Sequence, residues 1–178
     1  MSRKEELPLP ELTGLFDTHA HPTDNRFDED REALLASMRE RDMLCVCVGA
    51  DMESSAASVE LARREPMIYA SVGVHPHDAK TFREDDVPVL TDWLTREPKV
   101  VALGEIGLDY YYDLSPRDMQ RDVFARQLDL AYELHKPVIL HIREAHGDAT
   151  DILTARERAG RLPAGVMHCY TGLSLIHI

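Results

Sequence analysis

Pro137-Val138-Ile139-Leu140-His141 is the stretch that decides the fold, because four apolar residues follow one another and a histidine ends the run. A strand that is apolar at every position is buried on both faces, which is typical of parallel sheets covered by helices. A residue at the carboxyl end of such a strand lies on the rim where α/β proteins bind ligands. The stretch therefore predicts one strand of a parallel α/β fold with a functional side chain at its end.

The same pattern recurs along the chain. Three further apolar runs end in a polar residue: Ile68 to Val74 before His75, Val100 to Gly104 before Glu105, and Ala164 to Met167 before His168. Apolar runs begin near residues 15, 44, 67, 100, 137 and 164, so roughly 30 residues separate neighbours, enough for one strand, one helix and two loops. The spacing predicts a TIM (β/α)8-type barrel, incomplete here with about six of its eight strand-helix units. The alternative is an open doubly wound sheet, which fits the length but does not gather ligands around a ring.

Apolar periodicity predicts helices over Asp30 to Met43, Ser54 to Arg64, Asp86 to Arg96 and Ser115 to Leu134. In the last of these we expect Ser115 to be the N-cap and Pro116 the first helical residue, with Met119 and Val123 on the apolar stripe.

Composition predicts one domain, over residues 15–172, between an N-terminal lead of residues 1–14 and an atypical tail of residues 173–178. No apolar run approaches the roughly 20 residues that cross a bilayer, and no secretory-type stretch is present, so we expect a cytoplasmic protein. Cys45, Cys47 and Cys169 lack paired spacing, which favours buried free thiols over disulfides.

The net charge of −12 argues against a broad basic surface for nucleic acid, because Lys and Arg supply most non-specific affinity for phosphates. A metal-centred site escapes this objection, since a divalent cation can attract a phosphate even where the surrounding surface is acidic.

The segment Leu15-Phe16-Asp17-Thr18-His19-Ala20-His21 supplies candidate metal ligands. Along a strand, Asp17, His19 and His21 face one way while Phe16 and Thr18 face the other, so three potential ligands share a face. Two imidazoles two residues apart can share a metal ion. The alternative is a polar strand end whose histidines meet water or a backbone carbonyl.

Five motifs together resemble the TatD family of metal-dependent hydrolases. They are Asp17-Thr18-His19-Ala20-His21, Gly73-Val74-His75-Pro76-His77, Gly104-Glu105-Ile106-Gly107-Leu108-Asp109-Tyr110, Val138-Ile139-Leu140-His141-Ile142-Arg143 and His168-Cys169-Tyr170-Thr171-Gly172. The resemblance implies a TIM barrel related to the amidohydrolases, one or two divalent metal ions (Zn, Mg or Mn), and deoxyribonuclease activity. DNA is the implied substrate, with neither a membrane nor a stable protein partner.

The resemblance also implies roles for individual residues. His19 and His21 are expected to bind one metal and His141 and His168 the second, while Glu105 bridges both and is the catalytic residue. Imidazole nitrogens and a carboxylate suit borderline divalent ions, and a carboxylate can span two of them. The alternative for Glu105 is a buried carboxylate paired with an Arg or Lys.

On the substrate side, the resemblance implies that His75 and His77 lie against the phosphate. Arg143 is a candidate for a bidentate phosphate clamp, or alternatively for a buried pair with a carboxylate. Asp109 and Tyr110 complete the glutamate motif and are candidates for orienting it.

The sequence departs from the family after Gly172, where the family supplies a late aspartate that binds metal and accepts a proton from the attacking water. We therefore expect a truncated or misjoined end, and a chain without this aspartate lacks the residue that would act as general base in the complete enzyme. Three functional hypotheses follow: hydrolysis of DNA phosphodiesters, hydrolysis of another ester or amide such as an aminoacyl-tRNA ester, and a non-catalytic metal-binding fragment.

Overall fold

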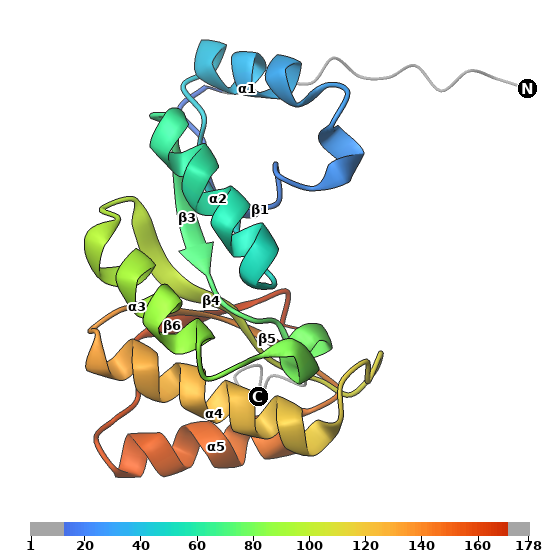
Figure 1. Cartoon of the computed structure of the whole chain (residues 1–178), viewed down its shortest axis with the longest axis vertical. Coiled ribbons are helices and arrows are strands. Elements are labelled where there is room, and N and C mark those ends of the chain that lie inside the picture. The colour runs from blue at the N-terminus through green and yellow to red at the C-terminus, as the bar shows by residue number, and fades with distance from the viewer. Residues whose placement is uncertain (1–12, 171–178) are drawn as a thin grey trace, which may run out of the picture.

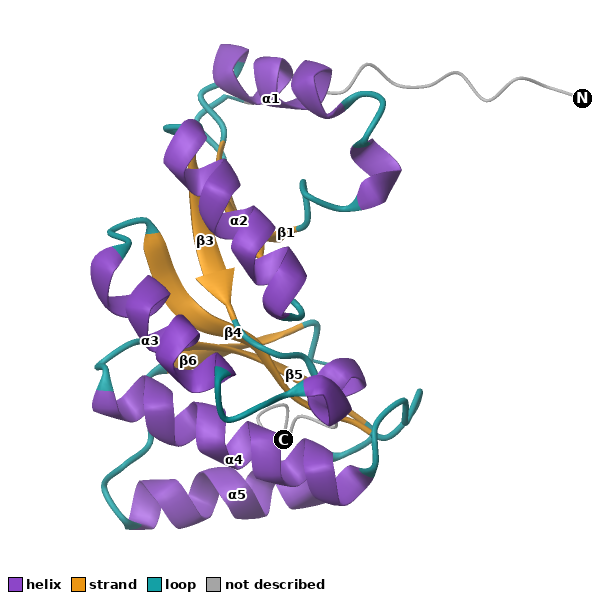
Figure 2. Cartoon of the chain, in the orientation of Figure 1, coloured by secondary structure: helices purple, strands orange, loops and turns teal. Residues whose placement is uncertain are grey.

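The computed structural model describes residues 13–170, in which strands and helices alternate (Figures 1 and 2). The strands are β1 (Phe16–Ala20), β2 (Leu44–Val48), β3 (Ile68–Val72), β4 (Val100–Asp109), β5 (Val138–Arg143) and β6 (Gly165–His168). The α-helices are α1 (Arg31–Glu40), α2 (Met52–Arg64), α3 (Asp86–Arg96), α4 (Arg117–Glu133) and α5 (His146–Arg158). Two short 3-10 helices, η1 (Asn25–Phe27) and η2 (Pro76–Thr81), lie in the loops after β1 and β3. The predictions for residues 1–12 and 171–178 lie outside the described residues.

The strands form one parallel sheet in the order β1-β2-β3-β4-β5-β6, so each connection leads to the next position in the sheet. This order is typical of (β/α) barrels, whereas a doubly wound sheet reverses direction at a switch point. The prediction of a barrel-type α/β fold is confirmed, and the doubly wound alternative is wrong.

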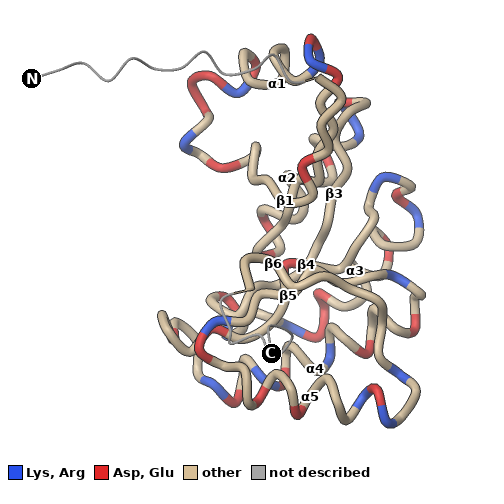
Figure 3. The backbone as a smooth tube through the Cα atoms, turned by 180° about the vertical axis from the view of Figure 1, so that it is seen from behind, with Lys and Arg blue, Asp and Glu red and all other residues tan. Residues whose placement is uncertain are grey.

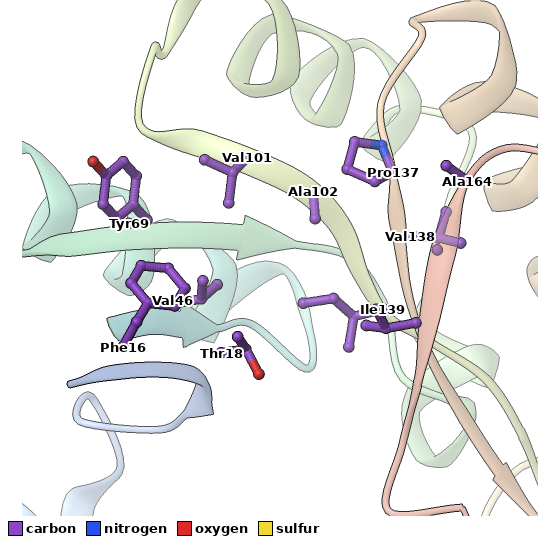
Figure 4. Close-up of a pocket in the computed structure, with 12 residues that line it drawn as sticks. Phe16, Thr18, Val46, Tyr69, Val101, Ala102, Pro137, Val138, Ile139 and Ala164 are labelled. Atoms are coloured by element: carbon purple, nitrogen blue, oxygen red, sulfur yellow. The ribbon is translucent and has the colours of Figure 1, made fainter. Parts of the chain in front are cut away.

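The sheet curls into a half-barrel, as shown by a hollow of about 680 Å³ to which all six strands contribute (Figure 4). Its lining is almost entirely apolar and includes Phe16, Val46, Tyr69, Val101, Ile139 and Val166. No histidine, carboxylate or cationic side chain of residues 13–170 lines it. The largest hollow is therefore the concave face of the half-barrel and not the place where the candidate functional residues gather.

The helices cover the outer face of the sheet: α2 packs on β2 and β3, α3 on β3 and β4, α4 on β4, and α5 on β5. In β2 the side chains alternate, with Cys45 and Cys47 in the core under the helices and Val46 and Val48 in the inner cluster. Both β2 cysteines are free and buried as expected, but Cys169 is exposed.

Helix α4 begins one residue later than predicted and buries only part of the predicted stripe. Its N-cap is Pro116, because the Ser115 hydroxyl instead donates to the His77 carbonyl at 2.7 Å and accepts the Lys80 N–H at 3.2 Å. Met119 is 47% exposed, while Gln120, one residue further along, is buried. The predicted cap was wrong because the η2 loop competes for Ser115. Of the predicted stripe, Val123 is buried in the core as expected, but Met119 is not, because polar Gln120 is turned inward in its place.

Charged residues lie mainly on the helices and loops, and the strands are largely free of them (Figure 3). No helix of residues 13–170 combines the length and apolar character needed to cross a membrane.

Candidate metal centre

The candidate ligands gather at the carboxyl ends of the strands, as the sequence predicts for a parallel sheet. Two groups of side chains bring their ligand atoms within 4.8 Å of one another. One group holds His19, His21 and Glu105, and the other holds His75, Glu105 and His141. Glu105 belongs to both, which is the position that a bridging carboxylate requires.

Glu105 lies inside β4 rather than directly after it, because the strand continues to Asp109. Its Oε2 is 3.4 Å from His19 Nε2 and its Oε1 is 3.2 Å from His141 Nδ1, so each oxygen faces a different histidine. Burial tends to raise the pKa of Glu105, but the hydrogen bond with His141 and the nearby ring of His19 outweigh it and hold the pKa well below its usual range. Glu105 is therefore an anion, and its partners are histidines, not the Arg or Lys of the alternative interpretation.

The two histidines of the first motif present their nitrogens differently. His21 Nδ1 lies 3.0 Å from the Val48 carbonyl, which can only accept, so the proton is on Nδ1 and Nε2 keeps a free lone pair. Both ring nitrogens of His19 are buried without a hydrogen-bond partner. Buried polar atoms normally have partners, so the bare nitrogens of His19 beside an anionic carboxylate fit a cation site.

His141 is held between two carboxylates. Its Nε2 lies 3.0 Å from Asp109 Oδ2, which leaves Nδ1 to face Glu105. Burial tends to lower the pKa of His141, but hydrogen bonds to Glu105 and Asp109 outweigh it and raise the pKa. Asp109 thus fixes which nitrogen of His141 points to the centre, as carboxylates commonly do for metal-bound histidines.

His75 and His77 lie beside His141, with ring centroids 4.4 Å and 6.2 Å from that of His141. His75 is 7% exposed, and its Nδ1 accepts the backbone N–H of His77 at 3.2 Å. Burial, with help from neighbouring His141, lowers the pKa of His75 to about 3, so the ring is neutral and carries its proton on Nε2. His77 Nε2 contacts Asp109 Oδ2 at 2.8 Å, so one carboxylate oxygen lies between His77 and His141.

Two predicted participants lie outside these groups. His168 stacks on His19, with ring centroids 3.5 Å apart and planes at 13°. Asp17, expected on the ligand face, instead accepts the backbone N–H of His19 at 3.0 Å, and the pairing of β1 with β2 shifts register between Asp17 and Ala20. This irregularity breaks the simple alternation on which the placement of Asp17 rested.

Arg143 forms no buried pair with a carboxylate within residues 13–170, contrary to one alternative from the sequence. Its guanidinium lies over the ring of Tyr111, 4.0 Å from the centroid. Tyr110, the other residue expected to orient Glu105, donates through its hydroxyl to Asp148 at 2.5 Å, and within residues 13–170 it makes no hydrogen bond to Glu105.

Sequence reasoning missed two buried glutamines of α4 that anchor the rim. Gln127 accepts the Val74 N–H at 2.8 Å and donates to the Val74 carbonyl at 2.9 Å, directly before His75. Gln120 accepts the Asp109 N–H at 2.9 Å and donates to the Ser115 carbonyl at 2.7 Å. Their spacing of seven residues, which places both on one helix face, was the available signal.

Comparisons with known proteins identify the family of this chain. Residues 16–174 match the family model described as TatD related DNase. The chain is 40% identical over 159 residues to the uncharacterized metal-dependent hydrolase YabD of Bacillus subtilis, covering 89% of this chain and 61% of YabD. It is 36% identical over 159 residues to the 3'-5' ssDNA/RNA exonuclease TatD of Cronobacter turicensis, covering 89% of this chain and 59% of that protein.

Among solved structures, the crystal structure of YJJV, a TatD homolog from Escherichia coli, superposes with a TM-score of 0.78 at 30% identity. The superposition covers 90% of this chain and 61% of YJJV, so the chain spans about three fifths of the length of these relatives. Because the family model matches nearly all of the described residues and the fold agrees, the chain belongs to the family of TatD related DNases.

Proposed function

We propose that this chain is part of a divalent-metal-dependent hydrolase that cleaves phosphodiester bonds of DNA, with one or two ions bound at the rim of the half-barrel. Membership of the TatD family supports hydrolysis, and the name of the Cronobacter relative supports a nucleic-acid substrate. The observation that carries the proposal is the position of Glu105, which has one carboxylate oxygen toward His19 and the other toward His141.

The donor set fits a divalent ion. His21 has Nδ1 at a backbone carbonyl and Nε2 free, His141 has Nε2 at Asp109 and Nδ1 facing Glu105, and both nitrogens of His19 lack a hydrogen-bond partner. Imidazole nitrogens with an anionic carboxylate suit Zn²⁺ or Mn²⁺, and Mg²⁺ would rely mainly on the carboxylate. Bound divalent ions supply Lewis-acid chemistry, polarising a phosphate oxygen and lowering the pKa of water.

We assign His19 and His21 to one ion, His141 and the stacked His168 to the second, and Glu105 to both. His75 lies as close to Glu105 and His141 as a ligand would, but its Nδ1 is already occupied by the His77 N–H. A neutral His75 therefore offers an Nε2–H donor, which suits a phosphate oxygen better than a cation.

The test measures metal binding and hydrolysis on the same protein. The purified chain is stripped of metal with a chelator and titrated with Mn²⁺, and free Mn²⁺ is followed by electron paramagnetic resonance. We expect one or two bound ions per chain. His19→Ala and Glu105→Gln should each weaken binding at least about 10-fold, because each removes a ligand. His135→Asn, an exposed histidine at the end of α4, is the matched control and should bind as wild type does.

The same samples are assayed for release of nucleotides from an end-labelled single-stranded oligonucleotide, beside a panel of carboxylic esters. Nucleotide release that requires Mn²⁺ and disappears in His19→Ala supports the proposal. Ester turnover without DNA cleavage would assign the centre to another substrate class. A chain that binds no Mn²⁺ would remove the basis of the proposal.

A further inference from the structure

An arginine and two tyrosines form a stacked cluster at the ends of β4 and β5. The guanidinium carbon of Arg143 lies 4.0 Å from the ring centroid of Tyr111 and 4.8 Å from that of Tyr112. The two tyrosine rings meet edge to face, with centroids 4.8 Å apart. Both tyrosines are 53% exposed, so the cluster presents aromatic surface to solvent.

Arg143 has hydrogen-bonding capacity to spare. Within residues 13–170, its guanidinium makes no hydrogen bond and no ion pair, whereas Arg121 pairs with Asp148 and Arg117 with Asp113. Contact with the aromatic faces orients the guanidinium without using its five N–H donors. Arg143 is therefore an oriented cation whose donors are free within the described part of the chain.

The cluster is connected to the candidate metal centre through one buried carboxylate. Asp109 Oδ1 accepts the backbone N–H groups of Tyr111 at 2.9 Å and Tyr112 at 2.8 Å. The Oδ2 atom of Asp109 contacts His77 and His141, and the Tyr112 ring lies edge-on to His77 with centroids 5.4 Å apart. The exposed tyrosines are thus held at a fixed place beside the residues proposed to bind metal and phosphate.

We infer that Tyr111, Tyr112 and Arg143 form a nucleotide subsite, in which a tyrosine ring stacks on an unpaired base and the guanidinium binds a neighbouring backbone phosphate. The inference rests on the proposed function, because only a phosphodiester bound at the candidate metal centre would bring a neighbouring nucleotide to Tyr111, Tyr112 and Arg143. Exposed aromatic rings bind single strands by stacking, and a planar guanidinium binds phosphate through paired hydrogen bonds. A fully paired duplex does not expose base faces, so the substrate class is single-stranded nucleic acid.

The test separates the base contact from the phosphate contact. Fluorescence anisotropy measures binding of a labelled oligothymidylate and of an abasic oligonucleotide of equal length, in Ca²⁺, with strand integrity checked on a gel. Tyr111→Ala and Tyr112→Ala should together weaken oligothymidylate binding about 10-fold or more, because stacking of each base is worth that much. Binding of the abasic strand should fall less, because it loses only the orientation of Arg143 and no stacked base. The Tyr→Phe variants, which keep the rings, should bind both strands as wild type does.

Arg143→Ala should weaken binding of both oligonucleotides and reduce the dependence of affinity on salt by about one phosphate contact. The matched control is Tyr132→Ala, since Tyr132 stacks with Arg161 in the same manner, 5.1 Å from guanidinium to ring, but at the far end of α4. This control should bind both strands normally.

The outcomes distinguish this subsite from the proposed function. If the wild-type chain cleaves DNA and the alanine variants bind both strands as tightly as it does, the subsite is wrong and hydrolysis of DNA stands. Equal losses for the base-bearing and abasic strands would also overturn stacking. If the wild-type chain binds Mn²⁺ but neither binds nor cleaves either strand, both proposals fail.

Discussion

At His141 the two nitrogens of one ring have different partners, Asp109 on one side and Glu105 on the other. The ring can keep Nδ1 toward Glu105 only if β5 keeps its distance from β4. That distance depends on Gly107, whose φ of +148° is rarely adopted by other residues. A Cβ built on Gly107 would lie 1.9 Å from the carbonyl oxygen of His141. The glycine of the glutamate motif therefore permits the close backbone contact that places this histidine.

Gly107→Ala should lower the free energy of unfolding by more than about 3 kcal/mol, because the methyl group meets backbone and the φ angle is strained. Displacement of His141 should also weaken Mn²⁺ binding. Chemical denaturation measures the free energy of unfolding, and Mn²⁺ titration measures the affinity for the metal. Gly147→Ala, in α5 with no atom within 4 Å of the new Cβ, should leave both quantities unchanged. If Gly107→Ala is as stable as Gly147→Ala, the prediction is wrong, and β4 and β5 can move apart to accept the methyl group without loss of stability.

Helix α4 holds the rim together through amide side chains, not through apolar contact alone. Gln127 satisfies both backbone groups of Val74, the residue before His75, and Gln120 contacts the backbone of Asp109. Residues at strand ends lose their neighbours in the sheet, so their backbone groups need other partners when they are buried. In a sequence such glutamines resemble surface residues of an amphipathic helix, and only the packed structure shows that they face inward.

Gln127→Ala should lower the free energy of unfolding by about 2 to 4 kcal/mol, since it leaves the N–H and C=O of Val74 buried without partners. Urea denaturation followed by circular dichroism measures the change. Asp122→Ala is the control on the same helix, because its contact with Arg126 is long, 3.9 Å, and mostly exposed. That variant should lie within about 0.5 kcal/mol of wild type. If the two substitutions lower the free energy of unfolding equally, Gln127 does not stabilise the rim through the backbone of Val74.

The molecule as a whole is a half-barrel with two distinct surfaces: a polar rim that holds the candidate centre and an apolar concave face. The concave face is formed by side chains such as Phe16, Tyr69 and Val166, of which Phe16 and Val166 are 49% and 59% exposed. Exposed apolar surface of this extent is uncommon on soluble proteins and binds other apolar groups.

The native chain should therefore bind the dye ANS in the hollow and increase its fluorescence, without the loss of near-ultraviolet circular dichroism that marks a molten globule. Val101→Lys should suppress the signal, because it places a charge in the hollow. Val89→Lys introduces the same charge on α3, at a valine that is 39% exposed, and should leave the dye signal intact. If the two variants bind ANS equally well, the dye site lies elsewhere.

Much of the fold and of the candidate centre follows from the sequence. Fully apolar runs such as Val138 to Leu140 specify buried parallel strands, and the residues that end them must meet at one rim, because all strands of a parallel sheet point the same way. This argument placed His19, His21, Glu105, His141 and His168 together. In the structure the first four lie in two groups that share Glu105, and His168 lies outside both, stacked on His19. Strand positions and the residues that end the strands depend on local composition and spacing alone, so they can be predicted from the sequence.

Other features were decided only when distant segments packed together. Asp109 determines which nitrogen of His141 faces Glu105, and the backbone of Val74 determines the orientation of the Gln127 side chain. The rings of Tyr111 and Tyr112 hold the guanidinium of Arg143 in place. Each of these features depends on contact with a residue of another element and on burial from water. Because hydrogen-bond geometry and burial are properties of pairs in space, the order of residues along the chain does not specify them.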